Sequence, residues 1–427
     1  MACGQACPKQ CISFNGDEEG FWYPHVDAEL CIDCGLCEKV CPVLHPFQSN
    51  RPLSTLAAVN PNEAIRANSS SGGVFTLLAE EVVSRGGVVF GAAYDSDWMV
   101  SITSAQTIGE LDKFRGSKYL QAKVGNTYRD CKAFLDTGIY VLFSGTPCQI
   151  SGLKHYLRKD YDNLITVDIV CHGVPSPGVW KQYLAEVSDA GKRAIRDVKF
   201  RDKRDGWRKF NFVIDYSEGS EEYVMASEHD KNPYMRAFLS DLILRPSCYE
   251  CPAKCGRGSA DITLADFWGA EHFIQDDDKG VSLVMLNTNK GTRLFQSCSI
   301  LPTSVDYDEV SKYNSAIFNS CSPHPKRAEF FASFVKGDGV NDLIVHLLKP
   351  SYRQQIRQLR STVKMLIKRV LHPVGGGKNR IVNSIPKNVQ PLYVNSVTFR
   401  DKTVSWRHYQ ILVCLKSDVI TDKRIVK

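Results

Sequence analysis

Long apolar runs are missing from this 427-residue sequence. No stretch approaches the ~18 consecutive apolar residues that a membrane-spanning helix requires. The first residues, Met1 to Gln5, contain no basic region followed by an apolar run, so we expect no signal peptide. These absences predict a cytoplasmic protein in a reducing compartment. The hydrophobic share of 43% and the charged share of 23% fit an ordinary globular protein.

Acidic residues are scarce only toward the end of the chain. From Lys349 to Lys427 there are 17 Lys and Arg residues and three acids, which gives this part a net charge of +14. Because the whole chain carries +6, the part before it carries −8. We therefore do not expect the body of the protein to bind nucleic acid.

The basic tail, residues 346–427, begins with a segment of helical spacing. Between Tyr352 and Leu371 apolar residues recur every three or four positions, and basic residues occupy the other face. We predict an amphipathic helix that docks on an acidic partner or makes a peripheral contact with an anionic membrane surface. A helix packed on its own domain is the alternative.

Cysteine is abundant and clustered in this sequence. Seven of the 16 cysteines fall within the first 41 residues. In a reducing compartment, clustered cysteines are more often metal ligands than disulfides. A secreted disulfide framework is the alternative, and the absence of a signal peptide disfavours it.

One cysteine group has the spacing of a bacterial two-cluster ferredoxin. It reads C-x2-C-x2-C-x3-C-P without deviation, and its residues are Cys31, Cys34, Cys37, Cys41 and Pro42. In such ferredoxins three of these thiolates hold one 4Fe-4S cluster, and the fourth reaches the neighbouring cluster. A zinc knuckle, the alternative, usually has a longer gap between its cysteine pairs. Residues 1–47 are therefore predicted to form a small ferredoxin-like α+β domain.

The partner motif of this ferredoxin pattern is incomplete. Cys3 and Cys7, followed by Pro8, match only its last part, C-x3-C-P. Cys7 should cross over to the cluster of the complete motif, which leaves Cys3 and Cys41 as ligands of a second cluster. Cys11 is either a stand-in ligand there or an ordinary buried thiol. We expect that the sequence begins within the first motif, so that the second cluster is empty or unstable.

Apolar strands alternate with helical segments from residue 55 onward. We predict strands at 55–59, 87–93, 139–143 and 164–170, and helices at 74–83 and 149–157. This alternation predicts an α/β domain over residues 55–345. Between residues 198 and 224 apolar and polar residues alternate, which predicts an antiparallel hairpin inserted in or beside the sheet.

Two loops of this body have the composition of an anion site. The first, Ser71-Gly72-Gly73, follows a strand and opens a helix, where backbone N–H groups can approach a phosphate. The second supplies two cations, a small turn and an aromatic ring through Arg115, Gly116, Ser117, Lys118 and Tyr119. We predict that both loops contact the diphosphate and ring of a flavin. An ordinary turn and a solvated basic loop are the alternatives.

Five cysteines of the body are candidates for a further cluster. Cys148 lies between a buried strand and a helix, where the helix dipole stabilises a thiolate. Cys171 follows another buried strand, and the carboxyl ends of strands frame the ligand site of an open α/β sheet. Cys248, Cys251 and Cys255 share one loop, for which a structural zinc site is the alternative.

These motifs together resemble the beta subunits of coenzyme F-420 hydrogenase/dehydrogenase, a family that includes 7-hydroxymethyl chlorophyll a reductase. The matching stretches are Ser71–Gly73, Gly116–Tyr119, Gly145–Cys148, Cys171–Gly173, Ser247–Cys251 and Ala265–Gly269. The resemblance implies FAD and hydride chemistry at the flavin. It also implies a 4Fe-4S cluster on Cys148, Cys171, Cys248 and Cys251. It leaves Cys255 as an extra thiol and does not cover the basic tail.

We therefore predict an iron–sulfur flavoprotein oxidoreductase that exchanges hydride with a small-molecule or deazaflavin substrate. Lys118 and His172 are the predicted catalytic residues, with His172 as a proton donor, although a hydrogen-bonded structural histidine is the alternative. For the whole chain, the alternatives are a non-catalytic electron-transfer subunit with a redox partner protein, and a zinc-stabilised binding protein. The sequence names neither the substrate nor the electron donor.

Overall fold

The computed structural model describes residues 1–349, 396–399 and 402–405. Residues 1–349 form one compact unit. In the second unit, β14 (Ser396–Phe399) and β15 (Lys402–Ser405) pair as a two-stranded antiparallel ribbon. The amphipathic helix predicted at 352–371 lies outside the described residues. Within the described ranges, no helix is both long enough and apolar enough to cross a membrane.

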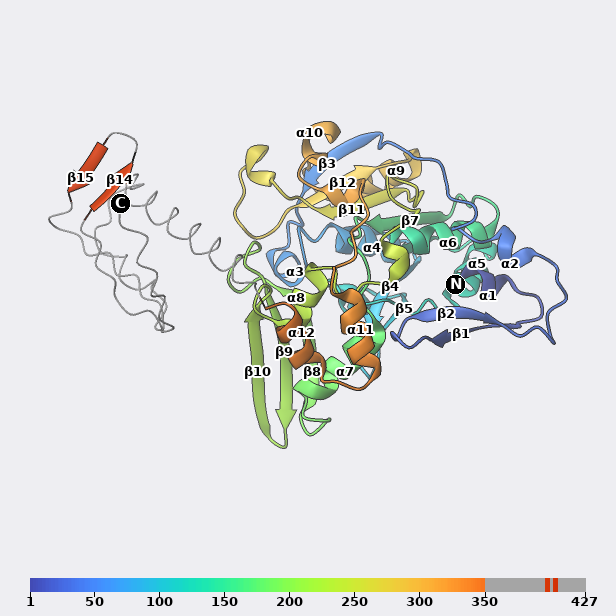
Figure 1. Cartoon of the computed structure of the whole chain (residues 1–427). Helices are drawn as coiled ribbons and strands as arrows, with labels where there is room; N and C mark the ends of the chain where they lie inside the picture. Colours follow the sequence, from blue (N-terminus) through green and yellow to red (C-terminus); the bar gives the residue numbers. More distant parts are fainter. Residues whose placement is uncertain (350–395, 400–401, 406–427) are drawn as a thin grey trace. The chain divides into compact units, whose positions relative to one another are not determined.

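An eight-stranded mixed sheet forms the centre of residues 1–349 (Figure 1). Its strand order is β13-β3-β12-β11-β7-β6-β4-β5. The strands are β3 (Ser54–Ala58), β4 (Val88–Tyr94), β5 (Val100–Ala105), β6 (Val141–Gly145), β7 (Leu164–Ile169), β11 (Ile262–Asp266), β12 (Ser282–Leu286) and β13 (Thr303–Ser304). The four central strands β11, β7, β6 and β4 are parallel to one another, and their outer neighbours β12 and β5 are antiparallel to them. The predicted α/β class and the four predicted strands are confirmed.

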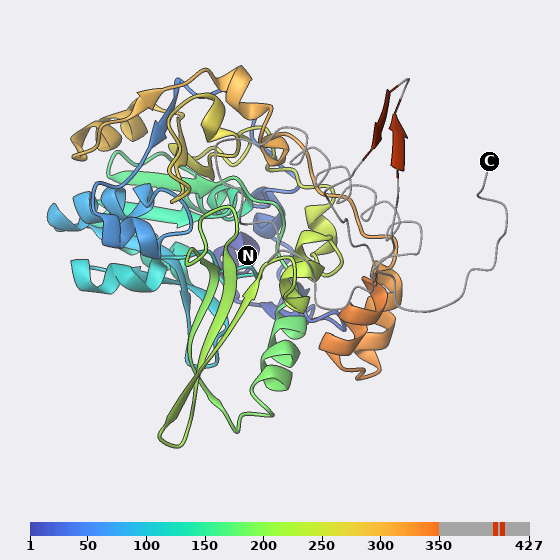
Figure 2. The same cartoon turned by 90° about the vertical axis from the view of Figure 1, so that its left-hand side faces the viewer.

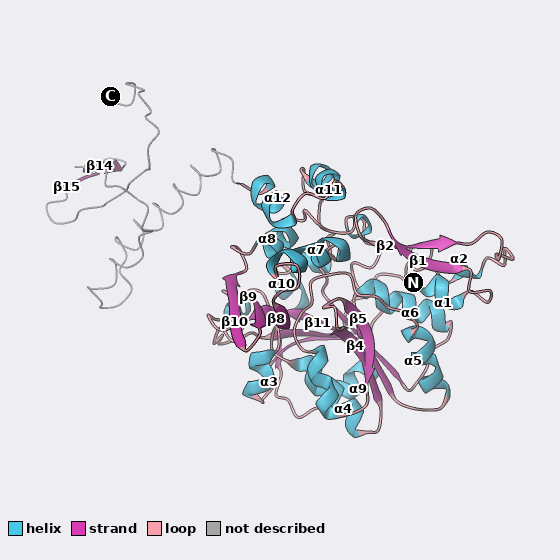
Figure 3. Cartoon of the chain, turned by 90° about the horizontal axis from the view of Figure 1, so that it is seen from below, coloured by secondary structure: helices cyan, strands magenta, loops and turns pink. Residues whose placement is uncertain are grey.

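Helices cover both faces of this sheet (Figure 3). On one face α4 (Val74–Ser84), the 3-10 helix η1 (Ile108–Phe114) and α9 (Asn289–Ser297) pack on alternate strand residues such as Leu142. On the other face α5 (Thr127–Asp136) and α6 (Pro147–Leu157) pack on their neighbours, such as Phe143. Because both faces are buried, the central strands are continuous apolar runs rather than alternating ones. A short helix, α3 (Glu63–Asn68), precedes α4.

A second, three-stranded antiparallel sheet projects from the body (Figure 2). It consists of β8 (Ala194–Asp202), β9 (Asn211–Glu218) and β10 (Glu221–Glu228) in the order β10-β9-β8. The predicted insertion is therefore antiparallel, as expected, but it has three strands instead of the two of a hairpin. The helices α7 (Pro177–Val187), α8 (Pro233–Leu239), α11 (Arg327–Val335) and α12 (Val340–Leu347) share its aromatic core.

The N-terminal segment folds as a small α+β unit. It comprises α1 (Ala2–Ala6), β1 (Ile12–Gly16), β2 (Trp22–Val26) and α2 (Leu36–Lys39), with β1 and β2 paired antiparallel. Its hairpin tip inserts into the body, because Phe21 is fully buried in the same core as α7 and α11. Glu19 beside it pairs with Arg327 of α11, one carboxylate oxygen accepting from Nη1 at 2.8 Å.

The contact between hairpin tip and body is tight at the backbone as well. A Cβ on Gly20 would lie 2.5 Å from the Cα of Gly178 in α7, so only glycine fits there. At the other end of the segment, the Gln5 side-chain oxygen accepts hydrogen bonds from the backbone N–H groups of Tyr128 and Arg129 in α5. The ferredoxin-like segment is therefore held at two places on the body.

We expect that Phe21→Ala lowers the free energy of unfolding by about 3–5 kcal/mol, because it leaves a cavity between two parts of the fold. Leu301, whose side chain is 96% exposed, provides the control: Leu301→Ala should change the free energy by less than about 0.5 kcal/mol. Urea unfolding followed by circular dichroism measures both. Equal effects in the two variants would contradict an anchoring role for Phe21.

Candidate functional site

The carboxyl ends of the parallel strands meet at one edge of the central sheet. β6 pairs in parallel with β7 from Val141 and Leu164 to Gly145 and Asp168, and β11 pairs in parallel with β7. The segments that follow these strands carry Cys148, Cys171 and the motif Asp266–Gly269. The structure therefore brings the sequence motifs to one side of the molecule, as the order of strands and loops predicted.

Cys148 occupies the first turn of α6. The helix begins at Pro147, and the Thr146 side chain and Gln149 form a capping box at its start. The Cys148 thiol lies 3.2 Å from the Thr146 hydroxyl. The structure thus places Cys148 at the start of a helix that directly follows β6, as the sequence predicted.

The four predicted ligands of the body cluster share one neighbourhood. Burial raises the pKa of Cys171 well above its usual value, and the charges of Cys148, Cys248 and Cys251 act in the same direction. Burial likewise raises the pKa of Cys248 to about 12, with Cys148 and Cys251 again as neighbours. The Lys254 ammonium donates to the Cys171 carbonyl at 2.6 Å and ties the two cysteine-bearing loops together.

Two further cysteines near this group, Cys255 and Cys321, contact different backbone carbonyls. Cys255 donates to the Phe318 carbonyl at 3.6 Å, and its charge is not among those that act on the other cysteines. Cys321 lies beside the group, with its thiol 3.6 Å from the Cys248 carbonyl. Sequence reasoning missed Cys321 because it stands alone, without a motif. Its position makes it a fifth thiol at this site.

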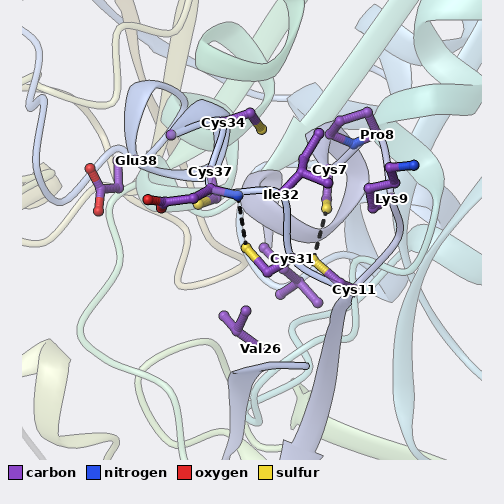
Figure 4. Close-up of a pocket in the computed structure, with 13 residues that line it drawn as sticks. Cys7, Pro8, Lys9, Cys11, Val26, Cys31, Ile32, Cys34, Cys37 and Glu38 are labelled. Atoms are coloured by element: carbon purple, nitrogen blue, oxygen red, sulfur yellow. Dashed lines mark hydrogen bonds between the residues drawn. The ribbon is translucent and has the colours of Figure 1, made fainter. Parts of the chain in front are cut away.

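A hollow in the ferredoxin-like segment is lined by three of the four cysteines of the complete motif (Figure 4). Cys31, Cys34 and Cys37 line it together with Cys7 from the first motif. This is the set that the crossover pattern of two-cluster ferredoxins predicts for one cluster. In α2, Gly35 is the N-cap residue with φ of 66°, which lets the chain turn between Cys34 and Cys37.

Cys11 also lines this hollow. Its Sγ atom lies 3.3 Å from Sγ of Cys7 (Figure 4). The hydrogen bond with Cys7 raises the pKa of Cys11 to about 11, followed by burial and the charges of Cys7 and Cys31. Cys11 is buried, as one of the two interpretations of the sequence predicted, but its thiol contacts Cys7, a predicted ligand of the cluster in this hollow.

Cys3 and Cys41 are not among the residues that line the hollow. The buried hydroxyl of Tyr128 donates to the Gln149 carbonyl at 2.7 Å. Burial raises the pKa of Tyr128, and the charges of Cys148, Cys131 and Cys3 add to the effect. Among the described residues, no three His, Cys, Asp or Glu side chains are close enough to hold a single metal ion.

The Ser-Gly loop packs closely against the sheet. A Cβ on Gly72 would come within 2.6 Å of the Ala58 carbonyl and of the Ser282 backbone nitrogen. Gly73 has φ of 79° and is the N-cap of α4, where no side chain caps the first N–H groups. The Ser71 hydroxyl donates to the Val281 carbonyl at 2.6 Å. The loop therefore leaves the N-terminus of an eleven-residue helix available to an anion.

The two predicted flavin loops touch each other. The Ser117 backbone N–H donates to the Ser70 hydroxyl at 2.6 Å, and Arg115 reaches Thr76 in the first turn of α4 at 3.4 Å. The Lys118 ammonium donates to the carbonyls of Arg115 and Gly116. Burial lowers the pKa of Lys118 to about 8. Arg115, which also pairs with Asp112 at 2.6 Å, thus lies beside the first turn of α4, and Lys118 lies in the same loop.

A buried arginine that sequence reasoning missed lies next to Tyr119. Arg201 of β8 donates through Nη1 to Asp266 at 2.8 Å and to the Tyr119 hydroxyl at 3.2 Å. Its Nε and Nη2 groups are buried without a hydrogen-bond partner. Its guanidinium lies 4.1 Å from the ring centre of Phe210, and Trp207 and Trp268 also flank it. The contact joins the three-stranded sheet to the central sheet, which no local pattern reveals.

His172 has a defined partner and lies beside an aromatic row. Its Nε2 is 2.6 Å from Oδ1 of Asp241, whose φ of 62° places it in the left-handed region. The His172 ring contacts Phe238 edge-on at 5.5 Å, and Phe238 stacks on Tyr119 at 4.5 Å. The cysteine group and the predicted flavin loop are therefore linked by direct side-chain contacts. Whether His172 and Lys118 are catalytic stays a prediction.

Comparison with known proteins agrees with both halves of this arrangement. Residues 1–44 match the 4Fe-4S dicluster domain, and residues 140–301 match the family described as the C terminus of the coenzyme F-420 hydrogenase/dehydrogenase beta subunit. One subunit of the F(420)H(2) dehydrogenase of Methanosarcina mazei is 23% identical over 33% of this chain and 40% of its own length. Ferredoxin 7Fe of Hydrogenibacillus schlegelii is 43% identical over 10% of this chain and 47% of its own length.

The matched segments thus span less than half of either curated relative. Among solved structures, the xenon-derivatised F-420-reducing NiFe hydrogenase complex from Methanosarcina barkeri contains a similar chain. It covers 63% of this chain and 90% of its own at 16% identity, with a TM-score of 0.42. Both sequence matches coincide with the cysteine motifs. The chain therefore joins a segment that matches the 4Fe-4S dicluster domain to a body in which residues 140–301 match the C terminus of the coenzyme F-420 hydrogenase/dehydrogenase beta subunit.

Proposed function

We propose that this protein is a cytoplasmic iron–sulfur flavoprotein that passes electrons between 4Fe-4S clusters and a substrate site at the flavin. The observation that carries the proposal is the row of contacts between cysteine group and flavin loops, His172 to Phe238 to Tyr119. The ferredoxin-like segment and the body lie within one compact unit.

The body cysteines suit a cubane better than they suit a single ion. A cubane binds each thiolate to a different iron, so its ligands stand apart from one another, whereas zinc draws four ligands to one centre. Burial raises the pKa of Cys171 and of Cys248, and the charges of Cys148 and Cys251 act in the same direction on both. A cationic iron core offsets these effects, because ligand thiols bind as thiolates.

The loops at the other end of the row suit a flavin dinucleotide. Bound flavin would supply two-electron hydride exchange with a substrate and single-electron exchange with clusters. The uncapped N-terminus of α4, together with Arg115 and Lys118, favours a diphosphate. Tyr119 and the buried Arg201 offer a ring surface and a positive charge next to it. The Asp241 carboxylate holds Nε2 of His172, so Nδ1 is the ring nitrogen that remains to exchange a proton.

A non-catalytic electron-transfer subunit is the second candidate. It is supported by the relative from Methanosarcina mazei, which is named as one of the subunits of F(420)H(2) dehydrogenase. Turnover of a deazaflavin or another small substrate by the purified chain with an artificial electron donor favours the reductase. Activity only in the presence of a co-purified partner protein favours the non-catalytic role.

We expect that alanine at Cys148, Cys171, Cys248 or Cys251 removes the same electron paramagnetic resonance signal and about four irons per chain. Cys255→Ala and Cys321→Ala are matched controls from the same site and should keep both. Anaerobic purification followed by iron analysis and spectroscopy measures the outcome. Loss of the signal in a control variant, with retention in one of the four, would show that the ligand set is wrong.

We expect that Lys118→Glu lowers flavin retention about tenfold or more, since a hydrogen bond to a charged group contributes about 1.5–3 kcal/mol. Lys113→Glu makes the same charge change at an exposed position of the preceding helix and should retain flavin.

Because the Lys118 pKa is lowered to about 8, its cation is present below that pH. Flavin affinity of the wild-type chain should therefore fall as pH rises above 8, and fluorescence titration across this range measures it.

A further inference from the structure

Residues 24–34 form one continuous exposed stretch of the ferredoxin-like segment. They join β2 to α2 at the outer end of that segment, toward the right-hand edge of Figure 1. Cys31 and Cys34, two thiols of the hollow, belong to this stretch and are themselves exposed. A cluster held there would lie at the protein surface, within a short distance of anything that contacts the stretch.

The same stretch exposes large apolar side chains. The exposed fractions are 47% for Val26, 56% for Leu30 and 57% for Ile32. Both Val26 and Ile32 line the hollow together with the cysteines. Apolar side chains gathered around a functional centre are typical of protein contact surfaces, whereas isolated ones are not.

This face is the free side of the ferredoxin-like segment. The hairpin tip and α1 are held on the body by Phe21, Glu19 and Gln5. In the described residues, the hydrogen bonds recorded for residues 24–34 stay within the ferredoxin-like segment, as between Asp27 and Cys11. The body therefore does not cover the stretch.

The negative charge of this surface indicates a partner with a basic contact surface. Residues 1–47 contain seven acids and two lysines, a formal charge of −5 in a chain that carries +6 overall. The exposed acids Asp27, Glu29 and Asp33 lie within the stretch, and Glu38 lines the hollow. Acidic side chains around an exposed apolar surface attract a protein that carries basic side chains around its own contact surface. This attraction raises the rate at which the two proteins associate.

We propose that residues 24–34 are the docking site of a one-electron carrier protein with a basic surface around its redox centre. The proposal rests on the proposed function, because the cluster behind Cys31 and Cys34 is the centre that exchanges the electron. One electron crosses the contact: the donor centre is oxidised by one electron and the acceptor is reduced by one. No proton or group is transferred. The relative potentials set the direction.

Mitochondrial cytochrome c, a basic haem protein, serves as the probe acceptor. The chain is reduced anaerobically, excess reductant is removed, and reduction of cytochrome c is followed by stopped flow. We expect the second-order rate constant to fall about tenfold between about 20 mM and about 200 mM ionic strength, because salt screens the attraction. An acidic carrier, flavodoxin, should show the opposite trend. A rate constant with cytochrome c that does not change with ionic strength, or a reaction with flavodoxin that is faster at low than at high ionic strength, overturns the proposal.

Two surface variants and two controls locate the site. Glu29→Lys should slow the reaction about three- to tenfold at low salt and flatten its salt dependence. Leu30→Ser should slow it at every salt concentration. Glu222→Lys on β10 and Leu301→Ser make the same changes at exposed positions outside the ferredoxin-like segment and should leave the rates unchanged. Equal slowing in the controls overturns the proposal.

Two further measurements separate the remaining outcomes. Iron and sulfide content is determined for every variant. A wild-type chain without either overturns both the docking site and the proposed function, whereas iron-loaded variants with wild-type rates overturn the docking site alone. Sedimentation velocity tests whether a second copy of this chain binds the stretch instead of a carrier. A dimer that Leu30→Ser dissociates would show this and would overturn the proposal.

Discussion

The arrangement of the body depends on one constraint, which is that one exposed and three partly buried cysteines share a neighbourhood. Cys148 and Cys171 come from the ends of parallel strands, and Cys248 and Cys251 come from a loop that returns to the same edge. Burial and the charges of neighbouring thiols disfavour the thiolate forms of Cys171 and Cys248. A positively charged group at this place would remove that penalty. The parallel register of β6, β7 and β11 brings these segments to one place.

In the proposed function, electron transfer depends on how rigidly the ferredoxin-like segment is attached to the body. Phe21 in the core of the body, the pair of Glu19 with Arg327, and Gln5 on α5 hold it at two separated places. Such an attachment keeps the thiols of the segment at a constant separation from Cys148, and it leaves the outer loop free. We therefore expect the ferredoxin-like segment to keep a fixed position on the body instead of moving on a flexible linker.

Much of this could be predicted from the sequence, for physical reasons. The buried strands are continuous apolar runs, and cysteine spacing is set by the geometry of a cubane, so both are local patterns. Arg201, Asp241 and Cys321 could not be found in this way. Each acquires its partner only through packing between segments far apart in the chain: Arg201 with Asp266, Asp241 with His172, and Cys321 with Cys248.

The position of Cys11 and the third strand of the inserted sheet also could not be predicted from local sequence patterns. The position of Cys11 relative to Cys7 depends on the turn after α1, which motif spacing does not specify. The third strand, β10, is mostly exposed and carries charged residues, so its alternation is weak and only its pairing with β9 defines it.

The central claim is that the chain binds iron–sulfur clusters and a flavin together. Metal, acid-labile sulfide and flavin content after anaerobic purification tests it most directly. We predict iron and sulfide in equal amounts, about eight of each per chain for two clusters, together with FAD. Stoichiometric zinc without sulfide, in a colourless protein, would contradict it.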